Sequence, residues 1–500
     1  MKTFISEFNT VACLKHRAIS RCFISVFSMV VLLYSAKSPA QTFDDLDSAI
    51  ASGSFGNLNA LIASRHGDII FEGYYRGTQA NDLHQVQSVT KSVGSALVGI
   101  AHRQGKIQLD QVMHDFFADL YPLSQGAYQG KSAITVEQIL QQRHGVLWDE
   151  DGSDYRAPQN PVNQMVQSRD WYQYFLTRPM DAVPGTKFAY SSGASNVMSR
   201  LIRVSTGMGP DEFAMQELFK PLGIDQVHWE VYSEDGPGTG LTDWPAPDHD
   251  VSLGFSLWLK ARDMLKIGEL YLNGGIHNGR RLLDKSWIDA SWTKYSHSGN
   301  SDFFPEPGWG YGYQWWVATL DDARGRDWQV FFASGWGSQV IFVVPELDLV
   351  VVTVADNYDY NGADVDALLN TLLNELSPDL DQRFDGSWYN PANDGQGFQL
   401  DILDDGETVI AYWYNYEADG SGEQRWFLLQ GQLVNGMAEV TIYKTSGGVF
   451  LQNDPYYLEE WGSGRFNAID CNHIELEFES DEAAATIPLT RITGVCFMAP

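Results

Sequence analysis

The chain has 500 residues, of which 44% are hydrophobic and 19% charged, a composition typical of folded proteins that excludes a disordered chain. Its length exceeds what one core ordinarily holds and predicts two folded units. The formal net charge of −31 repels phosphate backbones and anionic headgroups, so we expect no nucleic-acid partner. Solubility explains this acidity more simply than acidic recognition does.

Residues 1–40 predict an export signal. Lys15, Arg17 and Arg21 precede an apolar run, Cys22 to Tyr34, and small residues follow at 38–40. The run is short for a membrane span, although the long charged lead-in leaves an uncleaved anchor as the alternative. No cysteine directly follows the run, which disfavours a lipoprotein. We expect a periplasmic or secreted protein without membrane contact after signal cleavage.

Removal of this signal leaves two cysteines, Cys471 and Cys496. In an exported chain, two cysteines most simply form one disulfide, so we expect them to be joined and neither to be catalytic. The sequence has no cysteine and histidine spacing typical of a zinc site and no His-Glu-x-x-His. We therefore expect neither a metal nor a cofactor.

A β-hairpin is predicted over 61–75, with a turn at 66–68. A buried helix is predicted next, because apolar residues from Val89 to Ile100 recur every three and four positions. Ser88 lies at its first turn, and Lys91 follows three residues later on the same face. The first-turn N–H groups are unpaired and the helix dipole favours negative charge. A serine placed there can attack a carbonyl while its own N–H helps to hold the oxyanion.

The Ser-x-x-Lys pattern is weak by itself, since a capping serine near a solvated lysine explains an isolated match more simply. A second copy, Ser291 to Lys294, lies in a polar stretch with no helical apolar run after it. We therefore expect Ser88, and not Ser291, to be the nucleophile, provided that other motifs support it.

The next segments predict helices joined by functional loops. A helix is expected over 134–140 with Thr135 as its cap, and His144-Gly145 is interpreted as a helix-end turn, not as a catalytic histidine. Tyr190 is expected on a loop that leads into a helix with apolar positions from 197 to 204. Loops on a rigid scaffold often carry catalytic groups.

Strands 340–344 and 349–354 are predicted to form a central antiparallel pair, and 365–376 a closing helix before a boundary at Ser377-Pro378. From residue 382, aromatic residues become dense and Asp-Gly turns recur, which predicts an all-β module over 382–500. Core packing explains its aromatics better than glycan contact, which is kept as the alternative.

Three ordered motifs resemble the serine β-lactamase-like hydrolases over about residues 45–376. These are Ser88-x-x-Lys91, Tyr190-Ser191-Ser192 and Ala333-Ser334-Gly335. That family comprises class C β-lactamases, D-Ala-D-Ala carboxypeptidases and related esterases. The resemblance implies an α+β fold for 41–378, with an antiparallel sheet flanked by helices and a helical subdomain.

The resemblance also implies a role for each matched position. Ser88 would be the acylated nucleophile, Lys91 would accept its proton, and Tyr190 would relay it to the leaving group. The N–H groups of Ser88 and Trp336 would form the oxyanion hole, and Ser192, Ser334 and Gly335 would contact the substrate.

Two departures bear on specificity. Ser192 replaces the asparagine of the family's Tyr-x-Asn, and Ala333 replaces a cation or imidazole expected to face a substrate carboxylate. Both changes are similar to the carboxylesterase and 6-aminohexanoate-dimer hydrolase branch. The sequence thus predicts an exported serine hydrolase that cleaves small esters or simple amides. The alternatives are a cell-wall D-Ala-D-Ala carboxypeptidase or β-lactamase, and a catalytically dead binding protein. The tail, with Gly386 to Pro391, resembles an aromatic-rich module of secreted bacterial proteins that implies no activity.

Overall fold

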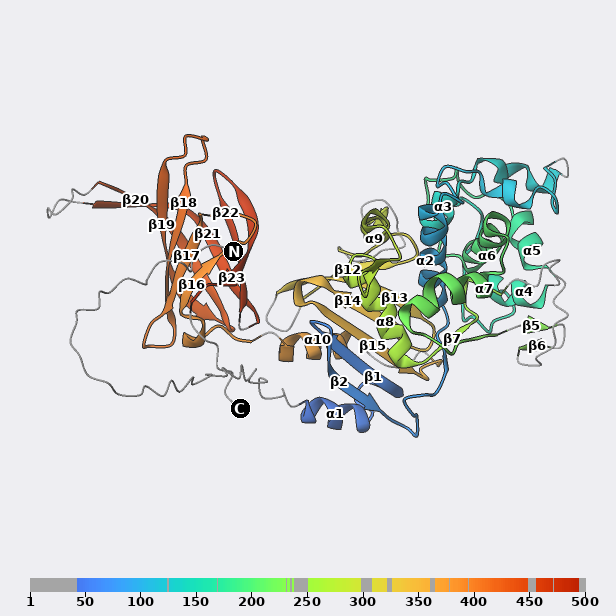
Figure 1. Ribbon diagram of the computed structural model, residues 1–500, viewed down its shortest axis with the longest axis horizontal. Helices are drawn as coiled ribbons and strands as arrows, with labels where there is room; N and C mark the ends of the chain where they lie inside the picture. Colours follow the sequence, from blue (N-terminus) through green and yellow to red (C-terminus); the bar gives the residue numbers. More distant parts are fainter. Residues whose placement is uncertain are drawn as a thin grey trace, which may run out of the picture. The chain divides into compact units, whose positions relative to one another are not determined.

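Figure 1 shows the computed structural model of the chain. It describes residues 43–123, 126–168, 170–230, 232–233, 236–237, 251–297, 308–321, 326–359, 365–376, 378–393, 395–447, 456–470 and 472–493. Residues 1–40, Cys471 and Cys496 lie outside these ranges, so the export signal and the disulfide stay predictions.

An antiparallel sheet organises the N-terminal two thirds of the chain, in the order β10-β11-β12-β13-β14-β15-β1-β2. Its strands are β1 (Leu58–Arg65), β2 (Asp68–Tyr74), β10 (Ser296–His297), β11 (Gly310–Tyr311), β12 (Trp316–Asp321), β13 (Asp327–Gly335), β14 (Gln339–Val344) and β15 (Leu349–Ala355). Short strands outside it are β3 (His84–Gln85), β4 (His228–Trp229), β5 (Tyr232–Ser233), β6 (Gly236–Pro237), β7 (Leu257–Leu259), β8 (Ile276–His277) and β9 (Arg280–Arg281).

Helices cover both faces of this sheet and build a separate helical region (Figure 1). They are α1 (Asp44–Ala51), α2 (Val89–Arg103), α3 (Val136–Leu140), α4 (Pro161–Gln167), α5 (Trp171–Thr177), α6 (Ser192–Thr206), α7 (Pro210–Ala214), α8 (Ala261–Leu272), α9 (Lys285–Ser291) and α10 (Val365–Leu376). α2 and α8 share one hydrophobic core with one sheet face, while α1 and α10 share a second core with the other. The sheet is therefore buried on both faces, which explains the continuous apolar runs of β14 and β15.

Several predicted elements are confirmed. β1 pairs with β2, and β14 with β15, as the hairpin patterns indicate. α3 begins after Thr135, whose side chain and that of Gln138 form a reciprocal capping box. α2 is buried from Val89 to Ala101 on all sides, a much wider burial than the apolar stripe alone predicts. This complete burial fixes the start of α2 firmly within the protein.

The C-terminal part forms a closed antiparallel barrel of β16 to β23. Its strands are β16 (Gly386–Tyr389), β17 (Gly397–Ile402), β18 (Thr408–Tyr416), β19 (Gln424–Val434), β20 (Met437–Gly447), β21 (Tyr456–Asp470), β22 (His473–Ser480) and β23 (Ala484–Arg491). Pairing of Trp388 with Arg491 closes the barrel and leaves no free sheet edge. Its core includes Trp388, Trp413 and Phe427, so the prediction that the aromatic residues pack in the core is confirmed for these three.

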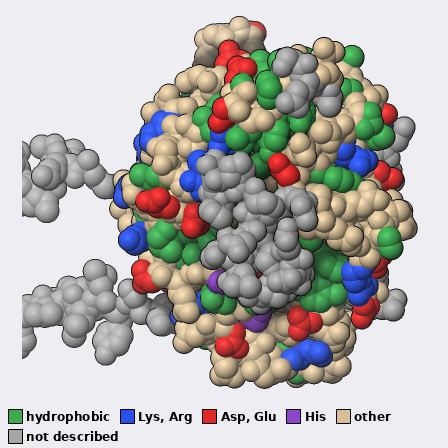
Figure 2. Space-filling model, turned by 90° about the vertical axis from the view of Figure 1, so that its right-hand side faces the viewer, with side chains coloured by type: hydrophobic (Ala, Val, Ile, Leu, Met, Phe, Trp, Pro, Cys, Tyr) green, Lys and Arg blue, Asp and Glu red, His purple; other side chains and the backbone are tan. Residues whose placement is uncertain are grey.

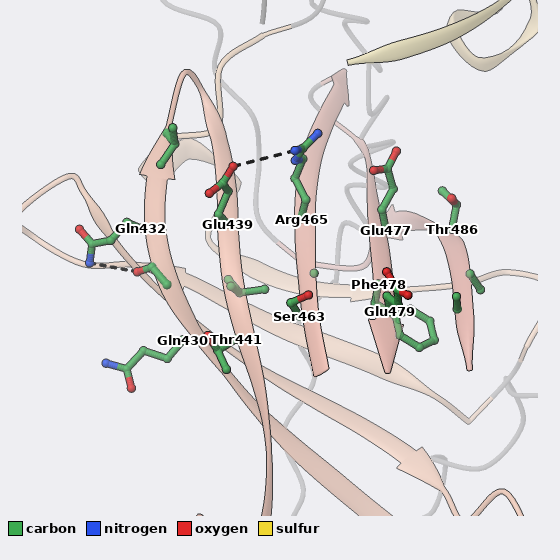
Figure 3. A pocket seen from close by; sticks show the side chains of 16 residues that line it. Gln430, Gln432, Glu439, Thr441, Ser463, Arg465, Glu477, Phe478, Glu479 and Thr486 are labelled. Atoms are coloured by element: carbon green, nitrogen blue, oxygen red, sulfur yellow. Dashed lines mark hydrogen bonds and ion pairs between the residues drawn. The ribbon is translucent and has the colours of Figure 1, made fainter. Parts of the chain in front are cut away.

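Polar and apolar side chains of the barrel line a cavity of about 1000 Å³ across β19 to β23. Figure 3 shows Gln430, Thr441, Ser463 and Thr486 among them, with Arg465 close to Glu439. Other aromatics, such as Tyr414 and Trp426, are exposed. Glycan contact by this module stays a prediction.

Acidic and basic side chains are interspersed on the face drawn in Figure 2, without a continuous basic patch among the described residues. Of the helices that the structure describes, none is both long enough and apolar enough to cross a membrane.

Candidate active site

The Ser88 hydroxyl and the Lys91 amine meet at the start of α2. Ser88 directly precedes the first residue of the helix, and Lys91 Nζ lies 2.7 Å from Ser88 Oγ. The preceding Gln87 has a φ of +50°, which is uncommon for a residue with a side chain. Such strain persists only where the surroundings hold it, so the Ser88 turn is firmly built into the fold.

Lys91 is buried, at 1% exposure, and its amine is surrounded by oxygen atoms. Besides Ser88, Nζ donates to Ser192 Oγ and to the carbonyl of Gly254, each at 3.0 Å. Burial lowers the pKa of Lys91 to about 8, although nearby Glu150 and Asp151 oppose the shift. The neutral amine, which can accept a proton, is therefore accessible near neutral pH.

Tyr190 lies beside this pair on the loop that leads into α6. The Lys91 Nζ is 4.9 Å from the centroid of its ring, and the ring packs on Trp316 at a centroid distance of 5.3 Å. Burial raises the pKa of Tyr190 well above its usual range, while an interaction with the Ser88 side chain opposes this. The phenol thus holds its proton next to the nucleophile.

A buried amide network fixes the Tyr190 loop. The Gln142 side chain accepts from the Ser191 N–H at 2.9 Å and donates to Ser195 Oγ at 2.7 Å. His144 bridges the same loop: its Nδ1 accepts from the Val146 N–H, which leaves Nε2 to donate to the Ala189 carbonyl. Burial lowers the pKa of His144 to about 4, so the ring is neutral. The helix-end turn predicted at His144-Gly145 lies earlier in the chain, because α3 ends at Leu140 and Gln142 takes the positive φ of +55°.

Two acidic residues that the sequence analysis missed lie beside Lys91. Glu150 is buried and accepts from Trp148 Nε1 and the Ser192 N–H, each at 2.6 Å. Ser192 Oγ also donates to Glu150 at 2.9 Å, so a chain of hydrogen bonds runs from Lys91 through Ser192 to Glu150. Burial raises the pKa of Glu150, and Lys91 lowers it. Asp151, in contrast, is exposed.

The end of β13 approaches Ser88 closely. A Cβ on Gly335 would lie 2.4 Å from the Val86 carbonyl oxygen and 3.1 Å from the Ser88 nitrogen, so only glycine fits there. The expectation that Ala333 presents its methyl group to the substrate needs correction. Ala333 is 1% exposed and belongs to the hydrophobic core, because alternate residues of β13 face opposite sides.

Two cavities flank Ser88. The first, of about 360 Å³ and here called the acidic cavity, is lined by Ser88, Asp151, Tyr155, Tyr190, Trp316, Ser334, Gly335, Trp336, Gly337, Ser338 and Asn357. The second, of about 410 Å³, is lined by Gln85, Gln87, Ser88, Tyr155, Arg156, Val162, Asn163, Val166, Ser192, Glu230, Phe255 and Trp336. The expected residues Ser192, Ser334, Gly335 and Trp336 thus all line a cavity that reaches Ser88.

The second Ser-x-x-Lys copy has a different geometry. Ser291 is buried at the end of α9, where its Oγ donates to the Trp287 carbonyl at 2.8 Å. Lys294 donates to the Gly308 carbonyl instead of meeting the serine. Ser291 and Lys294 therefore bond to the backbone and do not form a nucleophile and base pair.

Residues 58–374 match the β-lactamase family. The chain belongs to the β-lactamase family. This assignment agrees with the sheet, the helices on both of its faces and the order of the three motifs.

This family member is 24% identical over 341 residues to 6-aminohexanoate-dimer hydrolase of Paenarthrobacter ureafaciens, covering 65% of this chain and 79% of the relative. It is 23% identical to penicillin-binding protein 4 of Amycolatopsis lactamdurans, covering 65% and 83% of the two chains. Among solved structures, EstCE1, a hydrolase with promiscuous acyltransferase activity, has a TM-score of 0.50 at 16% identity. The match covers 65% of this chain and 95% of the EstCE1 chain. Two of these three proteins are named as hydrolases, and the structural likeness agrees with the β-lactamase fold.

Within the described part of this β-lactamase family member, no three His, Cys, Asp or Glu side chains are grouped so that they could hold a metal ion. The site consists of hydroxyl, amine, carboxylate and amide groups around Ser88, and these groups support acid–base chemistry on a serine.

Proposed function

We propose that this protein is an exported serine hydrolase that cleaves small esters or simple amides through an acyl-serine intermediate. The observation that carries the proposal is the 2.7 Å distance between Lys91 Nζ and Ser88 Oγ, in a buried site next to Tyr190. A nucleophile and a base within hydrogen-bond reach are the signature of covalent catalysis.

In the proposed acylation, neutral Lys91 takes the proton of Ser88 as Oγ attacks the substrate carbonyl. The backbone N–H groups of Ser88 and Trp336 stabilise the oxyanion. Tyr190 donates a proton to the leaving oxygen or nitrogen as the carbon–heteroatom bond breaks, and regains one from Lys91. Water then attacks the acyl-serine with the same groups acting in reverse, which releases the acid and restores Ser88.

Cleavage of D-Ala-D-Ala peptides or β-lactams is the second candidate, because penicillin-binding protein 4 is among the relatives. Such substrates carry a carboxylate. No Lys or Arg is among the described residues that line the acidic cavity, and Asp151 would repel a carboxylate there. A catalytically dead binding protein would not need a buried lysine held against a serine, so this alternative is disfavoured.

We expect neutral short-chain esters to be hydrolysed better than penicillins or D-Ala-D-Ala peptides. A charge-assisted hydrogen bond to a carboxylate contributes about 1.5–3 kcal/mol, so its absence costs anionic substrates roughly tenfold to a hundredfold in kcat/KM. The test compares an ester, an amide and a lactam series in wild-type and Ser88→Ala protein, with Ser291→Ala as the control. Efficient cephalosporin hydrolysis together with weak activity on neutral esters would contradict this proposal and support β-lactamase activity instead.

A further inference from the structure

The lining of the acidic cavity combines one carboxylate with several aromatic rings. Among the described residues that line it, Asp151 alone carries a formal charge, and four are aromatic: Tyr155, Tyr190, Trp316 and Trp336. Ser88 lies in the same cavity, so whatever part of a substrate enters it lies next to the scissile bond.

The Asp151 carboxylate faces this cavity without an ion-pair partner among the described residues. Among the described residues, the Tyr155 hydroxyl donates a hydrogen bond to it at 3.3 Å. The residue as a whole is exposed and lines the cavity, so a ligand in the cavity can reach it. Glu150, by contrast, is fully engaged by Trp148 and Ser192.

The charges around the cavity favour a cation. Arg156 lies with its guanidinium 5.6 Å from the centroid of the Trp336 ring, but Asp154 at 3.1 Å and Asp359 at 3.3 Å neutralise it. The positive charge of Lys91 is offset chiefly by Glu150. The carboxylates near the cavity therefore outnumber the cations, and the whole chain is strongly acidic.

We propose that the acidic cavity is a subsite for an ammonium group, so that the natural substrate is an ester or amide of a small cationic molecule. A carboxylate together with aromatic walls is the combination that binds alkylammonium groups, through charge and through the electron-rich ring faces. The inference rests on the proposed hydrolase function, since it assigns the substrate class of that same site.

The test uses two esters of the same shape, choline butyrate and its neutral isostere 3,3-dimethylbutyl butyrate. Because they differ only in charge, the ratio of their kcat/KM values isolates recognition of the cation. We expect the wild-type protein to prefer the choline ester about tenfold or more. In Asp151→Asn this ratio should fall towards one, whereas Asp149→Asn, an equal charge change outside the cavity lining, should keep it at pH 8, where Asp151 is mostly charged with or without Asp149.

The pH dependence of this ratio provides a second readout. Although Asp151 is exposed as a residue, the surrounding protein partly withdraws its carboxyl group from water, and this desolvation together with the Glu150 carboxylate raises the pKa of Asp151 to about 7. The other groups that act on it are Lys91, Asp149 and Tyr155. Asp151 gains its charge as pH rises through about 7, so the preference for the choline ester should increase between pH 6 and pH 8 in wild type and stay flat in Asp151→Asn.

Choline binding, measured calorimetrically without turnover, separates this inference from the proposed function. Binding to wild type and its loss in Asp151→Asn support the subsite even if neither ester is hydrolysed, an outcome that would contradict the hydrolase proposal. Turnover of the neutral ester with no preference for its cationic partner, or a preference that survives in Asp151→Asn, overturns the subsite and leaves the hydrolase proposal standing.

Discussion

Replacing Lys91 by methionine is expected to lower kcat for a neutral ester by roughly 10²–10⁴-fold, because the base that takes the Ser88 proton is lost. This corresponds to about 3–5 kcal/mol in the activation free energy. Methionine is close to lysine in volume and places no charge in this buried site, so the fold should persist. Steady-state kinetics with a melting curve on the same preparation separate lost catalysis from lost stability.

Lys131 offers a matched control, since it is also 1% exposed and burial lowers its pKa to about 8. Its amine donates to the Arg178 carbonyl, far along the chain from the Ser88 motif. Lys131→Met makes the same chemical change elsewhere and should keep kcat within a fewfold. If both variants lose activity equally, the effect belongs to stability and the role of Lys91 as the base is wrong.

Replacing Glu150 by glutamine is expected to have the second large effect, on both stability and the pH profile. The carboxylate accepts from Trp148 and twice from Ser192, and an amide nitrogen cannot replace all of these acceptors. Leaving a buried donor unpaired costs about 1–3 kcal/mol in the free energy of unfolding. Chemical denaturation measures this loss.

The pH profile shows whether Glu150 also sets the proton affinity of Lys91. In wild type, kcat/KM should rise with pH through about 8, where Lys91 loses its proton, and level off above that pH. Glu150 raises the pKa of Lys91, so Glu150→Gln should lower that pKa and move the rise to lower pH. Glu475→Gln in β22, another carboxyl with a raised pKa, is the control that should not move it. A destabilised Glu150 variant with an unmoved profile would limit Glu150 to a packing role.

Much of the site could be predicted because its main parts are local in sequence. Ser88 and Lys91 are one helical turn apart, so spacing alone places them together. Tyr190 required the resemblance, since no local rule predicts that the loop before α6 returns to the start of α2. The hairpin of β14 and β15 followed from two apolar runs separated by a short turn.

The parts that could not be predicted depend on contacts between distant residues. Glu150 meets Ser192 across 42 positions, and Gln142 meets Gln314 across 172. Neither Glu150 nor Gln142 belongs to a motif. The prediction that Ala333 faces the substrate was wrong. The motif gives only the position of Ala333 in the sequence, whereas the register of β13 against β14 decides which face of the sheet Ala333 occupies. Closure of the barrel rests on the pairing of its first and last strands, which composition does not reveal.

Ser88 is the nucleophile of the proposed reaction, and mass spectrometry after a serine-directed phosphonate probe tests this most directly. The geometry predicts a single adduct on the peptide that contains Ser88, with labelling slowed in Lys91→Met and unaffected in Ser291→Ala. An adduct on Ser291 with Ser88 unmodified, or ester hydrolysis that persists in Ser88→Ala, would contradict the account.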